Sequence, residues 1–258
     1  MQWNRMKLRR RLRTLQGAWD RGGLVGVAAR VAAWRVVPKW LAFVHDVDLL
    51  MLGELNARAL RPQPHYEFAL ADRSVLEELV ACTDTPASVE RRRAALARMF
   101  DFGASCVTMR DAGRIVAYVC AFTGTYHLTY DDYGPRTLAI ELDPNAVYLG
   151  NCFIRPEYRL RGLFPQLLAA CIALRPAGSR VFGHIDVGND HSFSSHLRLG
   201  FTPLLTITCL SLGSARIFFQ RPFGATRGTL IDERSPVHLI EKDGGFALGS
   251  VRAPARRT

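Results

Sequence analysis

The sequence predicts a mixed α/β fold in which a sheet with helices on its faces forms one domain over about residues 61–222. Strand and helix patterns alternate beyond the linker-like segment Arg61-Pro62-Gln63-Pro64, and the chain contains no internal repeat. Of its 258 residues, 48% are apolar, which is enough for a substantial core. A wholly disordered chain is therefore excluded.

The first half of this domain is expected to contain three strands and two helices before a long loop. The predicted elements are, in order, a strand over 66–70, helices over 74–81 and 88–99, and strands over 105–110 and 115–122. The segment Asp111-Ala112-Gly113-Arg114 is typical of a tight turn, so the last two strands should form an antiparallel hairpin. The polar and aromatic stretch 123–137 is expected to be a loop near the working face.

The second half begins with an apolar strand over 147–154 and continues with two helices and three further strands. The helix over 162–174 has one apolar stripe and ends before Pro176, and a buried strand over 181–186 follows it. A short helix over 192–199 should end at Gly200, a residue typical of helix C-termini. Strands over 204–212 and 216–220 complete the domain.

The formal net charge of +11 is concentrated at the two ends of the chain. Residues 1–40 contain ten Lys and Arg against one acid, residues 251–258 carry a net +3, and the remaining residues sum to −1. A nucleic-acid-binding domain needs basic side chains arrayed over a folded face, so a nucleic-acid partner is not expected for the body of the protein. Binding of nucleic acid through the ends stays open as an alternative.

The first 40 residues contain two basic, amphipathic helical patterns. Apolar residues recur at helical spacing over 8–19 and over 24–34, with arginines around them and a tryptophan at the end of each stripe. We therefore expect a helical basic extension over 1–60 that lies on an anionic membrane surface through residues 1–40, or packs on the main domain. The pattern contains neither a secretory signal nor an apolar run of about 20 residues that could cross a bilayer.

The six cysteines are spread along the chain without a C-x-x-C motif, so no metal site is expected. They lie in apolar runs and are interpreted as reduced core residues, which favours a cytoplasmic location. The cysteines are Cys82, Cys106, Cys120, Cys152, Cys171 and Cys209.

The most informative stretch runs from Cys152 to Phe164, where a buried strand is followed by an arginine-rich turn and a glycine that opens a helix. The first amides of a helix have no intrahelical acceptor and, with the helix dipole, form an anion site. Arg159 and Arg161 add positive charge around Gly162, so a diphosphate fits this turn. The turn has neither a Walker lysine nor the glycines of a dinucleotide fingerprint.

These residues resemble the GNAT acyltransferase superfamily, whose signature is Gln/Arg-x-x-Gly-x-Gly/Ala between a strand and a helix. The segment Arg159-x-x-Gly162-x-Phe164 matches the signature except at its last position, and the leader Pro156-Glu157-Tyr158 precedes it. Downstream, Asn189-x-x-Ser192 and Leu199-Gly200-Phe201 resemble the family's second turn, short helix and closing Gly-Phe. The resemblance covers about residues 64–222 and implies a mostly antiparallel sheet whose two central strands, 147–154 and 181–186, splay apart.

The resemblance implies an enzyme that uses acetyl-coenzyme A or another acyl-coenzyme A and needs no metal. The pyrophosphate would bind the backbone of Arg159, Leu160, Arg161, Gly162, Leu163 and Phe164. The pantetheine arm would pair with the backbone of Cys152, Phe153 and Ile154 and accept a hydrogen bond from Asn189. Because Phe164 replaces a small residue, its ring must point away from the ligand, and the helical stripe favours packing with Leu167 and Leu168.

The catalytic residues follow the family less closely. The tyrosine that often protonates the thiolate is replaced by His196, which can donate a proton or simply cap and pack the short helix. A strand position that carries a glutamate base in some members corresponds to Tyr148. A water relay is an alternative base, as are Glu141, Asp143, His184 and Asp186, whereas Cys152 is interpreted as a core thiol.

The sequence thus predicts an N-acyltransferase in which an amine attacks the acyl-coenzyme A directly in a ternary complex. The acceptor is expected to be a small-molecule amine, for which an amino sugar or a lipid-linked precursor is an option, and the location is the cytoplasm or the inner face of the membrane. The alternative is a non-catalytic GNAT-like module that binds coenzyme A or a partner. The expected organisation is a basic extension over 1–60, the acyltransferase domain over 61–222, and a hairpin with a basic tail over 223–258.

Overall fold

The structure is a computed structural model of the 258-residue chain that describes ten stretches of it. They are residues 42–60, 65–82, 86–128, 138–173, 175–176, 178–212, 215–225, 228–231, 236–242 and 245–249. The described residues belong to two compact units. Unit 1 contains 42–50, Ile185–Ser194 and 203–249, and unit 2 contains Met51–His184 and Ser195–Thr202. The helical patterns of residues 1–40 and the basic tail lie outside the described residues.

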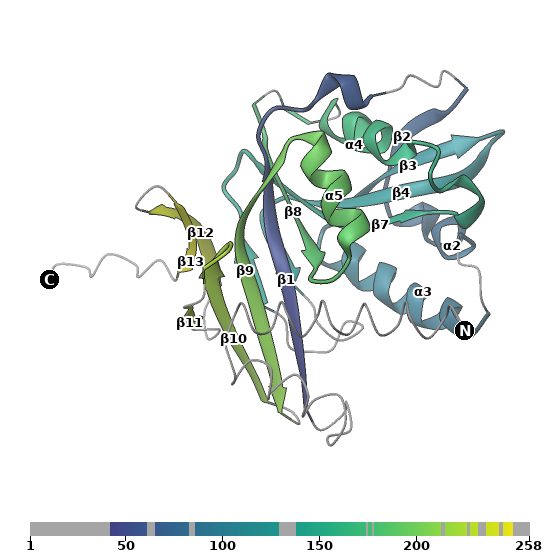
Figure 1. The fold of residues 1–258 in the computed structure, drawn as a ribbon. Helices are drawn as coiled ribbons and strands as arrows, with labels where there is room; N and C mark the ends of the chain where they lie inside the picture. The colour runs from purple at the N-terminus through teal and green to yellow at the C-terminus, as the bar shows by residue number, and fades with distance from the viewer. Residues whose placement is uncertain are drawn as a thin grey trace, which may run out of the picture. The chain divides into compact units, whose positions relative to one another are not determined.

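Unit 2 is built on a mixed sheet with the strand order β8-β7-β4-β3-β2 (Figure 1). The strands are β2 (Glu67–Ala71), β3 (Ser105–Asp111), β4 (Arg114–Phe122), β7 (Ala146–Ile154) and β8 (Arg180–Asp186). The pairs β2–β3, β3–β4 and β4–β7 are antiparallel, whereas β7 and β8 are parallel. The prediction of a mixed, mostly antiparallel sheet is therefore confirmed.

The β3–β4 hairpin closes through the turn that the sequence indicated. Asp111 lies opposite Arg114, and the two residues between them, Ala112 and Gly113, have φ of 48° and 78°. Two positive φ angles define a type I′ turn, whose twist matches that of the strands it joins. The short turn thus fixes the register of the two strands.

Helices cover both faces of this sheet (Figure 1). The helical elements are η1 (Ala57–Ala59), η2 (Arg73–Val75), α2 (Leu76–Val80), α3 (Pro86–Asp101), η3 (Pro156–Tyr158), α4 (Leu163–Ala173) and α5 (Asp190–Leu199). Arg92 of α3 hydrogen-bonds Tyr118, whereas Arg175, just after α4, hydrogen-bonds Ser105, which lies opposite Ala121. Tyr118 and Ala121 are three residues apart on β4, so their side chains point to opposite faces and place α3 and α4 on opposite sides.

A second small hairpin lies in unit 2, within and directly after the segment expected to be a loop. Strand β5 (Thr125–Leu128) pairs with β6 (Leu138–Glu141), and the residues between them lie outside the described part. Tyr126 and Leu128 are buried while Thr125 and His127 are half-buried. This alternation is typical of a strand, but four residues are too few to show it against a polar and aromatic background.

Unit 1 contains antiparallel strands at both ends of its sequence. They are β1 (Ala42–Leu52), β9 (Phe201–Leu212), β10 (Ala215–Pro222) and β11 (Thr229–Ile231), in the order β11-β10-β9-β1, together with the hairpin of β12 (Val237–Lys242) and β13 (Gly245–Gly249). The side chain of Gln220 on β10 both donates to and accepts from the backbone of Leu248 on β13.

Strand β1 corrects the expectation that the extension over 1–60 is helical. Asp46 and Asp48, two residues apart on β1, accept hydrogen bonds of 2.6 Å from Thr208 and Thr206 on β9. The carboxylates thus find hydroxyl donors on another strand, 158 or more residues away in sequence. Local periodicity does not indicate partners so distant in sequence, which explains why a helix was predicted where the structure has a strand.

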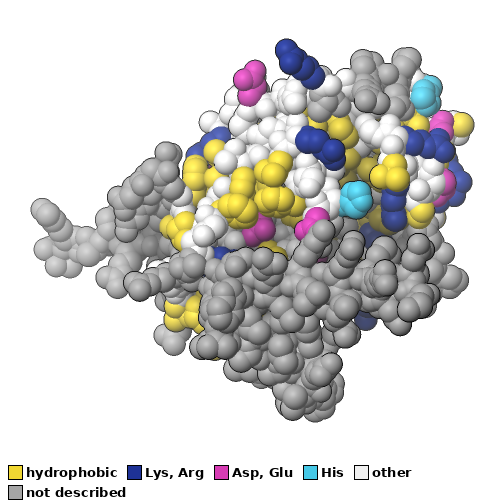
Figure 2. All heavy atoms as spheres, in the orientation of Figure 1, with side chains coloured by type: hydrophobic (Ala, Val, Ile, Leu, Met, Phe, Trp, Pro, Cys, Tyr) yellow, Lys and Arg dark blue, Asp and Glu magenta, His cyan; other side chains and the backbone are white. Residues whose placement is uncertain are grey.

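The surface of the described residues is mixed in character. On the face drawn in Figure 2, Lys and Arg side chains stand as scattered groups among acidic and apolar ones. This agrees with the near-neutral charge that the sequence assigns to the body of the protein. Within the described part of the chain, no helix is both long and apolar enough to span a membrane.

Candidate active site

The two parallel strands of unit 2 are paired over only part of their length. Their register begins at Ala146 of β7 and ends where Leu149 lies opposite Gly183 of β8. β7 nevertheless runs on to Ile154. The central strands therefore separate, as the resemblance implied, and the backbone of residues 152–154 lies on the opened edge. Its contact with a pantetheine arm stays a prediction.

A β-bulge at Asn151 bends β7 where this opening begins. Gly150 lies opposite Cys120 on β4 and Cys152 lies opposite Val119, so Asn151 has no residue opposite it. Its φ is 44°, a left-handed conformation that asparagine tolerates better than most residues. Bulges redirect a strand and are frequent near active sites. The sequence analysis missed this feature, for which the adjacent Gly-Asn pair was the available signal.

Aromatic rings fill the sheet face beside the bulge. A Cβ added to Gly150 would lie 3.2 Å from ring atoms of both Phe122 and Tyr126, so only glycine fits there without displacing a ring. The Tyr126 ring stacks on Tyr148 at 3.8 Å with an interplanar angle of 10°, and the His184 ring lies 5.8 Å from both tyrosines. Tyr148, a predicted catalytic residue, is therefore a buried member of an aromatic cluster, and its catalytic role stays a prediction.

The turn between β7 and α4 has the geometry of an anion site. After Ile154 the chain makes the short helix η3, and α4 then begins at Leu163, directly after Gly162. Leu160 and Gly162 have positive φ of 62° and 73°. Left-handed residues next to right-handed ones turn successive backbone N–H groups toward one concavity, and the first amides of α4 extend it. The predicted helix start is confirmed.

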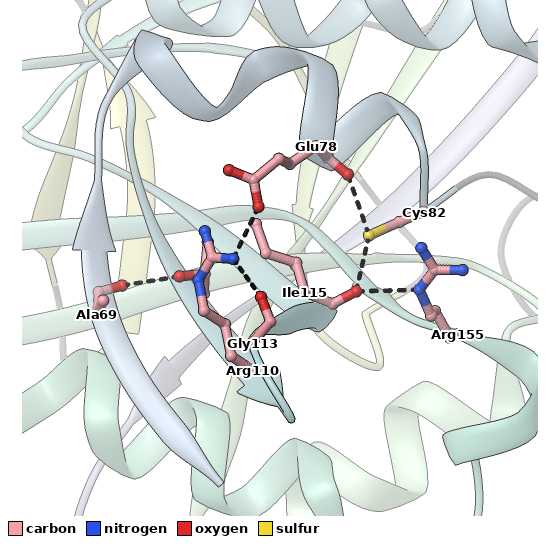
Figure 3. A network of polar contacts seen from close by, with 8 residues as sticks. Ala69, Glu78, Cys82, Arg110, Gly113, Ile115 and Arg155 are labelled. Carbon is pink, nitrogen blue, oxygen red and sulfur yellow. Dashed lines mark hydrogen bonds and ion pairs between the residues drawn. The ribbon is translucent and has the colours of Figure 1, made fainter.

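Side chains of the arginine-rich turn hold it in place (Figure 3). Arg155 is buried, and its Nε donates a hydrogen bond of 3.0 Å to the carbonyl oxygen of Ile115, as Figure 3 shows. Its Nη2 donates a second bond of 3.0 Å to the carbonyl oxygen of Ala81. The Tyr158 hydroxyl donates to Asp111 at 2.8 Å. Because these bonds tie the turn to α2 and to the β3–β4 hairpin, the backbone amides are presented by a fixed scaffold.

The positively charged groups expected at this turn are exposed. Arg159 uses its Nε to donate to the carbonyl oxygen of Ile154 at 3.0 Å, and its side chain is otherwise at the surface. The Arg161 guanidinium lies over the Tyr158 ring at 5.1 Å. Both cations thus remain near the α4 N-terminus, where they favour an anion.

Phe164 lies against a ring of the neighbouring helix α5. Leu167 and Leu168 are buried, but the half-buried Phe164 ring lies 4.7 Å from the ring of His196 on α5. The His196 ring also makes an edge contact with Phe201 at 5.0 Å. The ring of Phe164 therefore contacts α5, and its packing with Leu167 and Leu168 stays a prediction. These contacts support the packing alternative for His196, while its role as an acid stays a prediction.

Asn189 occupies the start of α5. Its Oδ1 accepts a hydrogen bond from the backbone amide of Ser192 at 3.3 Å, and its carbonyl oxygen accepts one from Phe193. This is an N-cap arrangement, which explains why an asparagine precedes the helix. A contact between Asn189 and the pantetheine arm stays a prediction.

Two of the three carboxylates considered as bases are engaged with basic side chains. Asp143 forms an ion pair with Arg180, and Asp186 lies 3.0 Å from Nε2 of His45 within unit 1. Glu141 is half-buried on β6. The described contacts therefore favour structural roles for Asp143 and Asp186, and do not distinguish a base.

Five of the six cysteines are buried, as expected for core thiols, but Cys152 is exposed on the opened edge of β7. Burial raises the pKa of the Cys82 thiol, whose Sγ donates to the Ile115 carbonyl oxygen at 3.3 Å. In the described residues, no group of three or more His, Cys, Asp or Glu is arranged to hold a metal ion.

Solved structures with a similar fold include several acetyltransferases. A GNAT-family protein from Novosphingobium aromaticivorans is 18% identical, with a TM-score of 0.44 over 70% of each chain. A GNAT-family acetyltransferase from Colwellia psychrerythraea is 12% identical, with a TM-score of 0.43 over 66% of this chain and 57% of that one. A protein of unknown function from Staphylococcus epidermidis is 10% identical, with a TM-score of 0.45 over 66% of this chain and 62% of that one. The match thus spans less than two thirds of the Staphylococcus and Colwellia chains.

No curated protein matches this chain significantly. The family model described as acetyltransferase (GNAT) family matches residues 73–201. This range includes the opened strands, the bulge and the glycine turn of unit 2, and it makes up half of the chain. The protein belongs to the GNAT acetyltransferase family.

Proposed function

We propose that the protein is an N-acyltransferase that transfers an acetyl or other acyl group from acyl-coenzyme A to a small-molecule amine in a ternary complex. The observation that carries the proposal is the continuity, in unit 2, of an opened β7 edge with a glycine turn and the N-terminus of α4. An opened strand edge can pair with an amide-bearing arm as if it were another strand, and helix amides bind diphosphate.

The chemistry asks the chain to position two substrates and manage one proton. The neutral amine attacks the thioester carbonyl, a C–N bond forms, the C–S bond breaks, and the departing thiolate takes a proton. Backbone amides at the bulge of Asn151 are proposed to polarise the carbonyl oxygen, because the bulge takes them out of regular pairing. His196 is proposed as the acid and a water as the base, with Tyr148 as part of the aromatic wall.

A matched pair of glycine variants tests coenzyme A binding. Gly162 and Gly113 have φ of 73° and 78°, and an added Cβ would meet no atom within 4 Å at either position. Gly162→Glu places a carboxylate in the proposed anion site, whereas Gly113→Glu introduces the same strain and charge in the turn of the β3–β4 hairpin, outside the α4 N-terminus. Calorimetry should show coenzyme A binding to the wild type and to Gly113→Glu and at least a tenfold loss for Gly162→Glu. Absence of binding by the wild type would refute the proposal.

A non-catalytic coenzyme A-binding module is the second candidate. It is favoured by the packing of Tyr148 and His196, the two predicted catalytic residues, against other rings. Release of free thiol from acetyl-coenzyme A across a panel of amines distinguishes the candidates, since only an enzyme shows amine-dependent release. If the imidazole donates the proton, His196→Gln should lower turnover in that assay. His196→Phe, which keeps a ring at this position, should have a smaller effect on stability.

The acceptor and the location extend the same proposal. We propose a small amine such as an amino sugar or a lipid-linked precursor, and a cytoplasmic enzyme held at the inner membrane surface by the +9 segment of residues 1–40. Sedimentation with anionic vesicles should retain the full chain and lose a variant without residues 1–40. If the vesicles retain both proteins equally, membrane binding through residues 1–40 is refuted, while the proposed acyl transfer is not tested by this result.

A further inference from the structure

Three arginines of unit 2 lie at the carboxyl end of β7 without a carboxylate partner among the described residues. Arg92 comes from α3, while Arg155 and Arg159 come from the turn that follows β7. Arg92 and Arg159 both lie over the ring of Phe153, the next-to-last residue of the strand.

Arg92 is held by two contacts. Its Nη1 donates a hydrogen bond of 2.8 Å to the hydroxyl of Tyr118, which is fully buried, and its guanidinium lies 4.8 Å from the centre of the Phe153 ring. The Phe153 and Tyr118 rings stack 5.9 Å apart. These contacts fix the guanidinium and leave its Nε and Nη2 donors without a partner among the described residues.

Arg159 approaches the same ring from the turn. Its guanidinium lies 5.8 Å from the Phe153 ring centre, and Nε donates to the Ile154 carbonyl oxygen. Two guanidinium groups are thus held within 6 Å of one ring. The buried Arg155 adds a third positive charge whose Nε and Nη2 are already bound to backbone carbonyls.

Two acidic side chains of helix α2 are paired with other arginines. Glu77 pairs with Arg93, and Glu78 pairs with Arg110. The positive charge around Phe153 is therefore not balanced by those two carboxylates. Like charges that are fixed close together repel, so an arrangement of this kind is stabilised by a bound anion.

We propose that Arg92 and Arg159, held at the Phe153 ring, form a second anion site that binds a phosphate group of a substrate. Guanidinium groups match phosphate geometry with paired N–H donors. Arg159 also flanks the α4 amides, whereas Arg92 reaches the Phe153 ring from α3, so a change at Arg92 tests this site without altering the α4 turn. The inference rests on the proposed function for the identity of the phosphate, which belongs either to the 3′-phosphate of coenzyme A or to a phosphorylated acceptor.

Calorimetry on the full chain separates the two sources. Coenzyme A and 3′-dephospho-coenzyme A are titrated into the wild type, Arg92→Gln and Arg98→Gln, and inorganic phosphate is then titrated into each protein saturated with coenzyme A. Arg98 is an exposed arginine on the same helix and controls for the change in net charge. Arg92→Lys keeps the charge without the fork, and thermal unfolding shows which variants are folded.

One outcome is that the wild type binds coenzyme A about tenfold more tightly than its dephospho form, that Arg92→Gln loses this preference, and that Arg98→Gln keeps it. This outcome assigns the site to the 3′-phosphate. Binding of inorganic phosphate to the saturated wild type, weakened about tenfold in Arg92→Gln only, assigns it to the acceptor. If neither Arg92-dependent effect occurs, the inference is wrong. A wild type that does not bind coenzyme A refutes the proposed function instead, and phosphate titration of the unliganded protein then decides the inference alone.

Discussion

Replacing Gly200 with alanine should destabilise the protein much more than the same change at Gly103. Both glycines follow the last turn of a helix, α5 and α3, with positive φ of 102° and 81°. A Cβ at Gly200 would lie 2.0 Å from the carbonyl oxygen of Glu54, whereas one at Gly103 would meet no atom within 4 Å. The two substitutions therefore share the backbone strain and differ in the clash.

The magnitudes follow from these two terms. A left-handed alanine costs about 1–2 kcal/mol, which is the whole expected loss at Gly103. At Gly200 the segment around Glu54 must also move, at a cost of about 1–3 kcal/mol for overpacking. That movement strains the hydrogen bonds of 3.1 Å from Gly53 to Gly200 and from Asn56 to Leu199, each contributing about 1 kcal/mol. We expect a total loss of about 3–5 kcal/mol for Gly200→Ala.

Urea unfolding followed by circular dichroism measures both variants against the wild type. The difference between the two losses in unfolding free energy isolates the close approach of Glu54 from the shared strain, provided that the denaturant slope is unchanged. Equal losses for Gly200→Ala and Gly103→Ala would refute the reasoning, because they would show that the chain around Glu54 moves aside without cost.

Three further predictions concern unit 2. Asn151→Val should lower the unfolding free energy by about 2 kcal/mol and weaken coenzyme A binding in calorimetry, because a β-branched residue resists the left-handed conformation of the bulge. Asn151→Gly should keep both the stability and the binding, and similar behaviour of the two variants would count against the bulge. Arg155→Met should cost about 3 kcal/mol in urea unfolding, since it leaves the carbonyl oxygens of Ile115 and Ala81 without their donor, and a loss below about 1 kcal/mol would contradict this. Burial lowers the pKa of His127, so its protonated form is disfavoured in the folded state. Its pKa in the folded state lies below that in the unfolded state, so stability should be constant above the unfolded pKa of about 6.5 and fall as the pH drops below it. His127→Gln should therefore flatten the pH dependence of the urea midpoint, and an unchanged slope would exclude this residue as the cause.

Elements with strong local signals could be predicted from the sequence. The β3–β4 hairpin follows from the short segment Asp111-Ala112-Gly113-Arg114, in which Gly113 readily takes the positive φ of a tight turn. The start of α4 follows from Gly162, which has the positive φ that the turn requires. In both cases the deciding interactions lie within a few residues of one another along the chain.

Strands that depend on distant partners could not be predicted in the same way. β1 was expected to be part of a helical extension, but Asp46 and Asp48 receive hydroxyl donors from Thr208 and Thr206 of β9. β5 was expected to be a loop, but its Tyr126 is buried, where its ring stacks on Tyr148 of β7. Local propensity cannot show a partner that lies more than twenty residues away.

The features of the candidate site also fall into a local group and a tertiary group. The sequence by itself determined the family resemblance and the glycine turn that opens α4 at Gly162, because that turn depends on backbone conformations set by neighbouring residues. Only the tertiary structure decided that β7 opens at Asn151, that the Phe164 ring packs on His196, and that Arg92 meets Arg159 at Phe153. Those arrangements are contacts between separate elements, and such contacts are fixed by packing and shape rather than by the pattern of any one segment.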